Sequence, residues 1–286
     1  MEQETLLSVE NLNVTFPSAK GDVVATENVS FSLGKEKIGI VGESGSGKSV
    51  SGRAILRLLP PYSQVQADSI RFKGKNLLSY SEKQMRKIRG KEISMVMQDP
   101  KYSLNPVRTV GHQIKEAYEI HRKVTQKEAK AQTLAMLAAV RIRNPEQVYR
   151  LYPHEVSGGM GQRIMIAMML IPEPSLLIAD EPTSALDVTV QLQVLAILDD
   201  LVTQRGMGLI FISHDLELVS TFCDRIVIMY GGRVMEIIEA QNLHNSTHPY
   251  TQGLLNCLPR IEEKKERLPV LVRDSGWLAP GPSTTK

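Results

Sequence analysis

Eight consecutive residues near the N-terminal end of the chain have the composition of a phosphate-binding loop. The sequence from Gly42 to Ser49 fits the pattern G-x-x-x-x-G-K-[ST]. Glycines let such a loop wrap closely, so that its backbone N–H groups point at phosphate oxygens. In this pattern Lys48 reaches the β- and γ-phosphates and the Ser49 hydroxyl binds Mg²⁺. We therefore expect a nucleoside triphosphate to be bound by Gly42, Glu43, Ser44, Gly45, Ser46, Gly47, Lys48 and Ser49.

Two adjacent carboxylates follow a short apolar segment later in the chain. Residues 176–179 are apolar, and Asp180 and Glu181 come directly after them. Open α/β sheets place ligand-binding residues at the ends of their strands. There Asp180 would support Mg²⁺, directly or through water, and Glu181 would polarise the water that attacks the γ-phosphate. A solvated pair that caps a helix is the alternative, and the phosphate loop argues against it.

The hydrophobic pattern places elements around both groups. A short strand is expected at residues 39–41 and a helix at 49–59, stopped by Pro60-Pro61. This strand–loop–helix context argues against a Gly- and Ser-rich loop without function. Further strands are expected at residues 6–16 (with one slip in the alternation), 23–33, 176–179, 209–213 and 226–229. The segment 69–97 is expected to contain short strands and a basic helix near residues 82–89.

A long helical region separates the two groups. Residues 110–170 are mostly helical in pattern, with breaks at Asn144-Pro145 and Pro153, and residues 189–204 form another helix. The alternation of strands and helices predicts an α/β sheet with a helical insertion. The residues from about 262 onward are charged and then rich in Pro, Gly and Ser, so we expect a loosely held tail there.

Composition excludes several classes of protein. Lys and Arg number 34 and Asp and Glu 31, a balance that argues against a dedicated nucleic-acid binder. The longest apolar stretch, residues 164–171, is shorter than the roughly 20 residues of a membrane span. The two cysteines are far apart, which predicts reduced thiols. Any membrane role is therefore expected to come through a partner.

An ordered set of motifs resembles the ABC ATPases. Ser157, Gly158, Gly159 and Met160, followed by Gln162-Arg163, resemble the signature motif of that family. The segment from Ser184 to Asp187 resembles its D-loop, and His214 its switch histidine. Gln98 resembles the Q-loop glutamine, and Phe16 stands where the family has an aromatic residue that stacks on adenine. The resemblance covers about residues 6–258.

Taken singly, these residues have other interpretations. A Ser-Gly-Gly sequence is often a turn, and here it is expected to open a helix that begins near Gln162, where a helix N-terminus suits an anion. His214 alone would be a structural histidine, and Gln98 alone a solvated polar residue. Phe16 is interpreted almost equally well as a core phenylalanine. The order of the motifs favours the functional interpretation of His214 and Gln98 and leaves Phe16 open.

The resemblance implies a fold and a mechanism. The implied fold is that of a P-loop NTPase of the ABC type, with a RecA-like core sheet, an antiparallel β lobe and a helical signature subdomain. The ATPase domain is expected at residues 1–258, with the helical subdomain at about 105–170. A partly disordered tail is expected at 259–286. Two such domains form a head-to-tail sandwich around two ATP molecules, so Ser157 to Met160 contact a nucleotide held by the partner. Glu181 and His214 are the expected catalytic residues, and Ser49, Gln98 and Asp180 the expected Mg²⁺ ligands.

Further residues resemble one branch of the family, the ATPase subunits of dipeptide, oligopeptide and nickel importers. They are Val50, the segment Gln98-Asp99-Pro100, Ser103 to Pro106, Ala185 to Thr189, and His248 to Thr251. There are two departures: Gly161 replaces a larger, often basic residue, and no cysteine follows Cys257, so we expect no iron–sulfur cluster. The expected partners are a second ATPase subunit, identical or different, two membrane permease subunits and, indirectly, an extracytoplasmic solute-binding protein. The chain itself is expected to be a peripheral subunit at the cytoplasmic face of the cell membrane.

Other classes fit the sequence less well. ABC ATPases that act on DNA or the ribosome carry coiled coils or two ATPase domains, which do not fit a chain with one phosphate loop. A subunit that binds ATP without hydrolysing it would not need both Glu181 and His214. A P-loop kinase or GTPase would lack the signature motif, and the sequence contains no guanine-binding N-K-x-D pattern. We expect no nucleic-acid partner.

Overall fold

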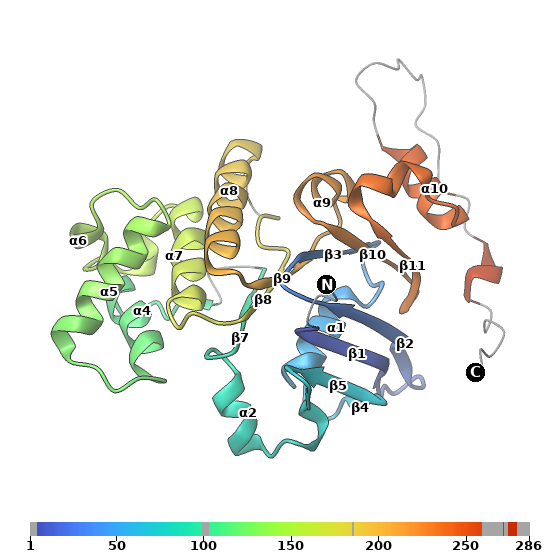
Figure 1. Ribbon diagram of the computed structural model, residues 1–286, viewed down its shortest axis with the longest axis horizontal. Coiled ribbons are helices and arrows are strands. Elements are labelled where there is room, and N and C mark those ends of the chain that lie inside the picture. The colour runs from blue at the N-terminus through green and yellow to red at the C-terminus, as the bar shows by residue number, and fades with distance from the viewer. Residues whose placement is uncertain (1–4, 99–102, 185, 259–270, 272–273, 279–286) are drawn as a thin grey trace. The chain divides into compact units, whose positions relative to one another are not determined.

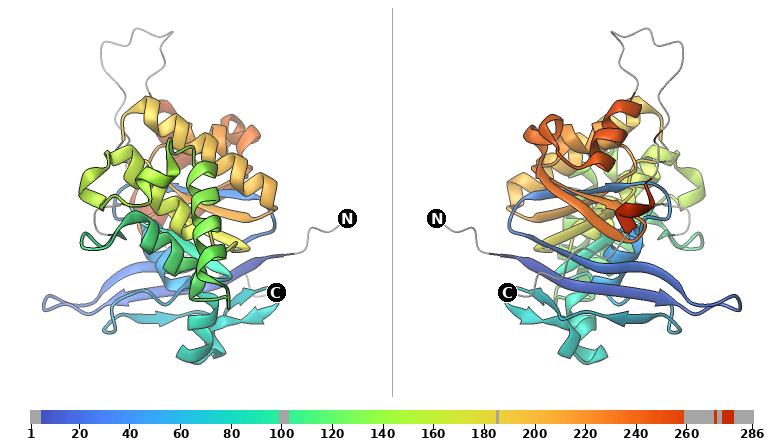
Figure 2. Two further views of the ribbon diagram at one scale, coloured as in Figure 1. Left: turned by 90° about the vertical axis from the view of Figure 1, so that its left-hand side faces the viewer. Right: turned by 90° about the vertical axis from the view of Figure 1, so that its right-hand side faces the viewer.

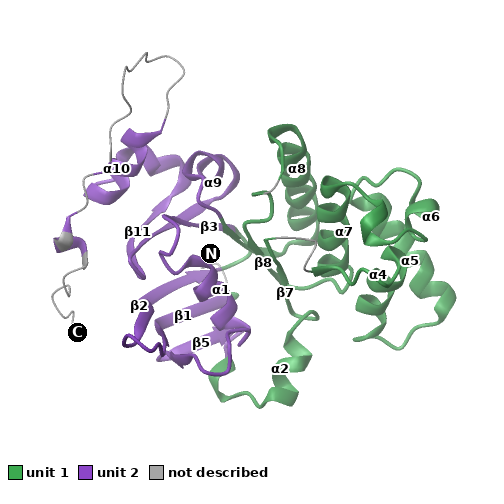
Figure 3. Cartoon of the chain, turned by 180° about the vertical axis from the view of Figure 1, so that it is seen from behind, with its two compact units in different colours: residues 1–6, 34–36, 77–212 green, residues 7–33, 37–76, 213–286 purple. Residues whose placement is uncertain are grey.

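The computed structural model describes residues 5–98, 103–184, 186–258, 271 and 274–278. The expected features at Asp99, Pro100 and Ala185 lie outside these residues. The chain divides into two compact units, coloured differently in Figure 3. Unit 1 contains residues 1–6, 34–36 and 77–212, and unit 2 contains residues 7–33, 37–76 and 213–286. The expected helical subdomain at 105–170 lies within unit 1, and each unit contains part of the expected site.

Unit 2 contains the antiparallel lobe. Strand β1 (Leu7–Phe16) pairs with β2 (Val23–Leu33), β4 (Gln64–Gln66) and β5 (Ser69–Phe72), all antiparallel, and β5 pairs with β6 (Lys75–Asn76). Figure 2 shows β1 and β2 side by side in blue. The slip in the alternation of β1 is a bulge, since the register shifts between Val9 and Leu12, and Asn11 has a φ of 50°. The predicted strands are confirmed, and the sequence did not indicate β4.

The rest of unit 2 carries the phosphate loop. Strand β3 (Lys37–Gly42) runs parallel to β10 (Arg225–Tyr230), which pairs antiparallel with β11 (Arg233–Glu239). Helices α1 (Lys48–Ile55) and α9 (Leu216–Phe222) contact β3, and α10 (Pro249–Cys257) contacts β11. The predicted helix at 49–59 ends four residues early, because Arg57 takes a left-handed φ of 51° and its N–H bonds the Ala54 carbonyl.

Unit 1 contains a parallel set of strands. Strand β8 (Leu176–Asp180) lies between β7 (Ile93–Val96) and β9 (Gly208–Ile212), and every residue of all three strands is buried. Their continuous apolar sequence is what strands covered on both faces require. Helix α8 (Val188–Arg205) leads from β8 to β9, and α2 (Glu82–Ile88) precedes β7. Because parallel strands end at the same edge, residues that follow β7 and β8 are brought together.

The helical insertion is confirmed. It contains α4 (Val110–Glu119), α5 (Gln126–Ala139), α6 (Pro145–Val148) and α7 (Gly158–Leu170), and α7 contacts α4, α5 and α8 (Figure 1). The breaks expected at Asn144-Pro145 and Pro153 begin α6 and a short 3₁₀ turn. The prediction that the signature helix begins near Gln162 is wrong. The helix begins at Gly158, because the hydroxyl of Ser157 accepts the Met160 N–H and serves as the N-cap.

Within the described ranges, no helix is both long and apolar enough to span a membrane. Both cysteines are free, as expected, and burial raises the pKa of the Cys223 thiol. Residues 275–278, in the segment expected to be a loose tail, form a 3₁₀ turn, and the Trp277 ring packs against Tyr250 at a centroid distance of 5.5 Å. This contact gives the segment an apolar anchor that its composition did not indicate.

Candidate ATP-binding and catalytic site

The phosphate loop joins the end of β3 to the start of α1 and depends on its glycines. Gly42, Gly45 and Gly47 have φ values of 154°, 80° and 94°. A Cβ on Gly42 would lie 2.1 Å from the Met229 carbonyl oxygen. A Cβ on Gly47 would lie 2.6 Å from the Ala25 carbonyl oxygen of β2. Both positions therefore need glycine for conformation and for space, and the loop is fixed against β10 and β2.

Lys48 is positioned inside this loop. Its ammonium group donates to the carbonyl oxygens of Gly42 and Glu43, both at 2.8 Å, and to the Ser46 hydroxyl at 3.4 Å. The side chain is 5% exposed, whereas Ser44 and Gly45 at the loop tip are exposed. A buried cation held by backbone oxygens at the N-terminal end of a helix provides a concentrated positive site for phosphate.

His214 follows β9 in a turn that belongs to unit 2. The Ser213 N–H donates to the Ile40 carbonyl oxygen of β3 at 3.1 Å, two residues before the phosphate loop begins. The Ser213 hydroxyl accepts the Asp215 N–H, and Asp215 caps α9. His214 is exposed between these two anchored neighbours. The structure therefore fixes its backbone to the strand that leads into the phosphate loop.

Phe16 lies at the end of β1, opposite Val23 of β2 in the strand register. Its ring is half-buried and makes an edge contact with the Tyr62 ring, with 6.5 Å between centroids. This position disfavours the interpretation of Phe16 as a core residue, because the core positions of β1, such as Leu12 and Val14, are fully buried. The sequence analysis did not single out Tyr62, because this residue, two positions before β4, belongs to no recognised motif.

The two carboxylates lie where β8 ends. Asp180 is the last residue of β8, pairs with Ile212 in the register and is 1% exposed. Glu181 has a left-handed φ of 46°, and its N–H donates to the Ile212 carbonyl oxygen at 2.9 Å. Left-handed backbone is costly for a residue with a side chain and persists where the surroundings impose it. The turn directs two adjacent acids to the same end of the strand.

Gln98 meets Glu181 at this end. Gln98 follows β7, and its amide nitrogen donates to the Glu181 carboxylate at 3.3 Å. The Ser184 hydroxyl donates to the Glu181 carbonyl oxygen at 3.2 Å and holds the turn from the other side. The contact leaves the Gln98 amide oxygen as an acceptor next to the carboxylates. The structure thus brings together two residues that the sequence only indicated separately.

The signature segment is shaped by contacts between α7 and α8. A Cβ on Gly159 would lie 2.6 Å from a methyl group of Val190, whereas a Cβ on Gly158 would meet nothing within 4 Å. Asp187 caps α8, because its carboxylate accepts the Val190 N–H at 3.0 Å. The same residue, Val190, therefore connects the signature segment to Asp187. This places Asp187 first of all in a structural role at the N-terminus of α8.

A cavity of about 600 Å³ opens beside the signature segment and is lined by Ser157 and Met160 together with three arginines, Arg141, Arg143 and Arg163. Arg141 pairs with Asp200. Arg163 donates to the backbone oxygens of Gly159 and Arg141, and burial lowers its pKa. The surplus of positive charge next to a capped helix N-terminus favours an anion near Ser157.

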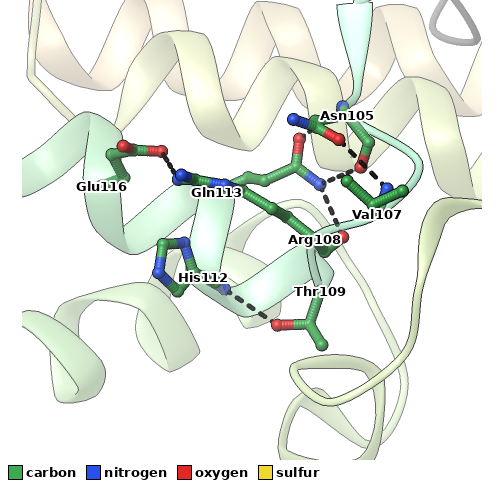
Figure 4. Close-up of polar contacts among 7 residues, drawn as sticks. All are labelled: Asn105, Val107, Arg108, Thr109, His112, Gln113 and Glu116. Atoms are coloured by element: carbon green, nitrogen blue, oxygen red, sulfur yellow. Dashed lines mark hydrogen bonds and ion pairs between the residues drawn. The ribbon is translucent and has the colours of Figure 1, made fainter.

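The turn that follows the Q-loop region is held by one buried side chain, Gln113 of α4 (Figure 4). The Gln113 amide accepts the Asn105 N–H at 2.8 Å and donates to the carbonyl oxygens of Asn105 and Arg108, both at 3.0 Å. Arg108 also pairs with Glu116 at 2.8 Å. This clamp fixes a turn whose Val107 side chain is 79% exposed. Sequence reasoning singled out the turn but not Gln113.

The strand–loop–helix phosphate site, the acids at the end of a parallel strand and the capped signature helix define a class, the ATP-binding cassettes. The sequence matches the ABC transporter family at residues 26–184, more than half of the chain, and the chain belongs to this family.

Similar proteins support this assignment along most of the chain. The dipeptide transport ATP-binding protein DppD of Bacillus subtilis is 48% identical, over 91% of this chain and 78% of that protein. The oligopeptide transport ATP-binding protein OppD of Escherichia coli is 43% identical, over 93% and 80%. The structure of cbiO1 from Clostridium perfringens has a TM-score of 0.72 at 26% identity, covering 88% of this chain and 96% of that one. A dimeric ATP-binding cassette bound to ADP and Pi has the same fold, with a TM-score of 0.73.

Proposed function

We propose that this chain is the ATP-hydrolysing subunit of an importer that moves peptides across a membrane. The observation that carries the proposal is the contact of Gln98 with Glu181 beside the buried Asp180. It holds a carboxylate at a strand end, where a water can be polarised for attack on a phosphate. The relatives named for dipeptide and oligopeptide transport favour peptides over nickel as the solute.

The residues divide the chemistry between them. The glycine loop and Lys48 bind the phosphates and offset their charge, and Phe16 stacks on the base. Glu181 acts as the general base, and its strained backbone supports the orientation of its carboxylate. His214 contacts the γ-phosphate from the turn anchored at Ile40. Gln98 senses the bound nucleotide and contacts the general base Glu181.

The residues present suit Mg²⁺. Asp180 provides a buried carboxylate, Ser49 a hydroxyl at the start of α1, and Gln98 the amide oxygen that its contact with Glu181 leaves available. These are the oxygen ligands that Mg²⁺ prefers, and Mg²⁺ is usually held by few protein ligands together with substrate phosphates.

The site is completed by a second cassette. The N-terminus of α7, with Ser157, Gly158, Gly159 and Met160, offers backbone N–H groups and lies beside the three arginines, so it suits the phosphates of a nucleotide held by a partner. The turn clamped by Gln113 presents the exposed Val107 in a fixed conformation, which suits docking to a permease subunit. Two permeases and, indirectly, an extracytoplasmic solute-binding protein complete the importer, and this chain lies at the cytoplasmic face of the membrane.

The Glu181→Gln variant tests the proposal through three measurements: its ATP binding, its ATPase rate, and its mass in solution with and without ATP. Without its general base the variant should bind ATP and lose turnover by about a hundredfold or more. Lys48→Ala is the matched control, because it should lose ATP binding as well. Undiminished turnover in Glu181→Gln would overturn the catalytic assignment.

The mass measurement addresses the partner. A dimer that forms only with ATP would show that two copies of this chain complete the sandwich. A monomer that binds ATP would indicate either that the second cassette is a different chain or that the membrane subunits are needed to bring the two cassettes together. Mixing the variant with candidate ATPase subunits would distinguish the two. The solute is tested by measuring which peptides stimulate ATP hydrolysis in the assembled importer, with Ni²⁺ as the competing candidate.

A further inference from the structure

One exposed aromatic side chain near the end of β1 has no role in the function proposed above. Tyr62 is 63% exposed, and its ring lies edge-on to Phe16, with the ring planes at 65° and the centroids 6.5 Å apart. This is the favourable T-shaped geometry of an aromatic pair. Among the described residues, its ring contact is with Phe16, so Tyr62 is placed to act through Phe16.

The backbone around Tyr62 fixes the contact. The hydroxyl and the N–H of Ser63 both bond the Pro60 carbonyl oxygen, which closes a turn around Tyr62. Strand β4 starts directly afterwards and pairs with β1, with Gln64 opposite Thr15. Because Phe16 follows Thr15, the antiparallel register carries Tyr62 past the end of β1. The proline-rich turn therefore limits where the tyrosine ring can lie.

Phe16 in turn lies close to the phosphate loop along β2. Val23 pairs with Phe16 and Val24 with Thr15. The next residue, Ala25, is the one whose carbonyl oxygen Gly47 of the loop approaches. In the proposed function, the base of a nucleotide whose phosphates occupy the loop lies at this end of the β1–β2 ribbon. Phe16, Tyr62 and the half-exposed Val23 provide apolar surface there.

We propose that Tyr62 is a positioning residue that holds the Phe16 ring in the orientation in which it stacks on the adenine base. The proposal rests on the proposed function of the site and adds a specific residue to it. A free phenylalanine ring at a strand end samples several rotamers, and restricting it reduces the entropic cost of stacking a ligand on it. Tyr62 makes this restriction without contacting the phosphates.

The test compares two ligands that differ by the nucleoside and are not hydrolysed by this site, ADP and pyrophosphate, by titration calorimetry on the full chain. Tyr62→Ala should weaken ADP binding by about two- to tenfold, the range of a lost aromatic pair, and leave pyrophosphate binding unchanged. Tyr62→Phe keeps the ring and should bind ADP like the wild type. Leu58→Ala, which removes another exposed apolar side chain just before the turn, should have no effect.

A double variant separates a positioning role from direct contact with the base. In a Phe16→Ala background, Tyr62→Ala should cause no further loss of ADP binding, because Tyr62 acts through Phe16. Additive losses, an unchanged ADP affinity in Tyr62→Ala, or an equal loss for pyrophosphate would each overturn the proposal. If the wild type binds ADP and Tyr62→Ala binds it equally well, only this inference is contradicted. If the wild type binds neither ADP nor pyrophosphate, the proposed nucleotide-binding site itself is contradicted.

Discussion

The amide nitrogen of Gln98 donates to the carboxylate of Glu181 across 3.3 Å, although 83 positions separate the two residues in the chain. The contact exists because β7 and β8 are parallel neighbours whose carboxyl ends meet at one edge of the sheet. It joins the expected nucleotide sensor to the expected general base within unit 1. A residue that follows a different strand therefore contributes to the orientation of the Glu181 carboxylate.

This contact makes the effect of removing Gln98 predictable. Gln98→Leu keeps the approximate size of the side chain but cannot donate to Glu181. We expect ATP turnover to fall by about tenfold, as for a misoriented catalytic group, less than in Glu181→Gln. In the Glu181→Gln background, Gln98→Leu should reduce turnover no further. Steady-state ATPase rates of the four proteins decide this, and independent, multiplicative losses would contradict the coupling.

The two signature glycines should respond differently to the same substitution. Gly159→Ala places a methyl group 2.6 Å from Val190, so we expect a loss of about 1–3 kcal/mol of unfolding free energy and reduced ATPase activity. Gly158→Ala, where nothing lies within 4 Å, should be neutral or slightly stabilising in helix α7. Adding Val190→Ala to the Gly159→Ala variant should restore its unfolding free energy, because it removes the methyl group that the new Cβ meets. Denaturant unfolding of the three variants and the double variant measures this, and equal losses at both glycines would refute the packing argument.

The clamp on the turn at Asn105 predicts a specific pattern of amide protection. Gln113→Ala leaves the Asn105 N–H and two carbonyl oxygens without their partner and should cost about 1–3 kcal/mol. Gln113→Glu keeps an acceptor for the Asn105 N–H and loses only the donors. Hydrogen exchange should therefore accelerate at the Asn105 amide in Gln113→Ala and much less in Gln113→Glu.

Arg108→Ala is the comparison for this clamp, because it removes only a half-exposed ion pair with Glu116 and should cost less than about 1 kcal/mol. If Arg108→Ala accelerates exchange at Asn105 as much as Gln113→Ala does, the ion pair and not the amide clamp holds the turn.

A half-buried carboxylate in unit 2 predicts a pH dependence of stability. Burial acts to raise the pKa of Glu236, but hydroxyl hydrogen bonds from Ser246 (2.5 Å) and Thr251 (2.6 Å), with a further backbone hydrogen bond, outweigh it and lower the pKa. A carboxyl whose pKa is lower in the folded state stabilises the fold above its unfolded pKa of about 4.3 and loses that contribution as pH falls through the folded pKa.

Glu236→Gln should therefore unfold more easily than the wild type at pH 7, by about 1 kcal/mol after allowance for solvent screening. The difference should shrink once the pH falls below about 4. Urea unfolding of both proteins at pH 7 and pH 3.5 measures it. A constant difference at both pH values would show that the charge of Glu236 does not provide the stabilisation.

Much of the fold was predictable because its signals are local. The strands at 6–16 and 176–179 and the helix at 189–204 carry clear patterns, and the phosphate loop is contiguous, with its glycines defined by type and spacing. The start of α7 was misplaced by four residues, because Gly158 and Gly159 are poor helix formers and the cap provided by Ser157 was not recognised. Strand β11 was missed because its residues are half-exposed and lack a clear alternation.

The sequence by itself determined the chemistry available to this protein: a phosphate loop with Lys48, an acidic pair after an apolar strand, and motifs in an order that resembles one family. These features depend on neighbouring residues, whose backbone conformations and charges are local properties. Only the tertiary structure decided three contacts. Gln98 hydrogen-bonds Glu181, Val190 packs where a side chain on Gly159 would lie, and the Tyr62 ring contacts the Phe16 ring. Those contacts depend on strand order, register and helix packing, which arise from burial of the whole chain and are not encoded in any single segment.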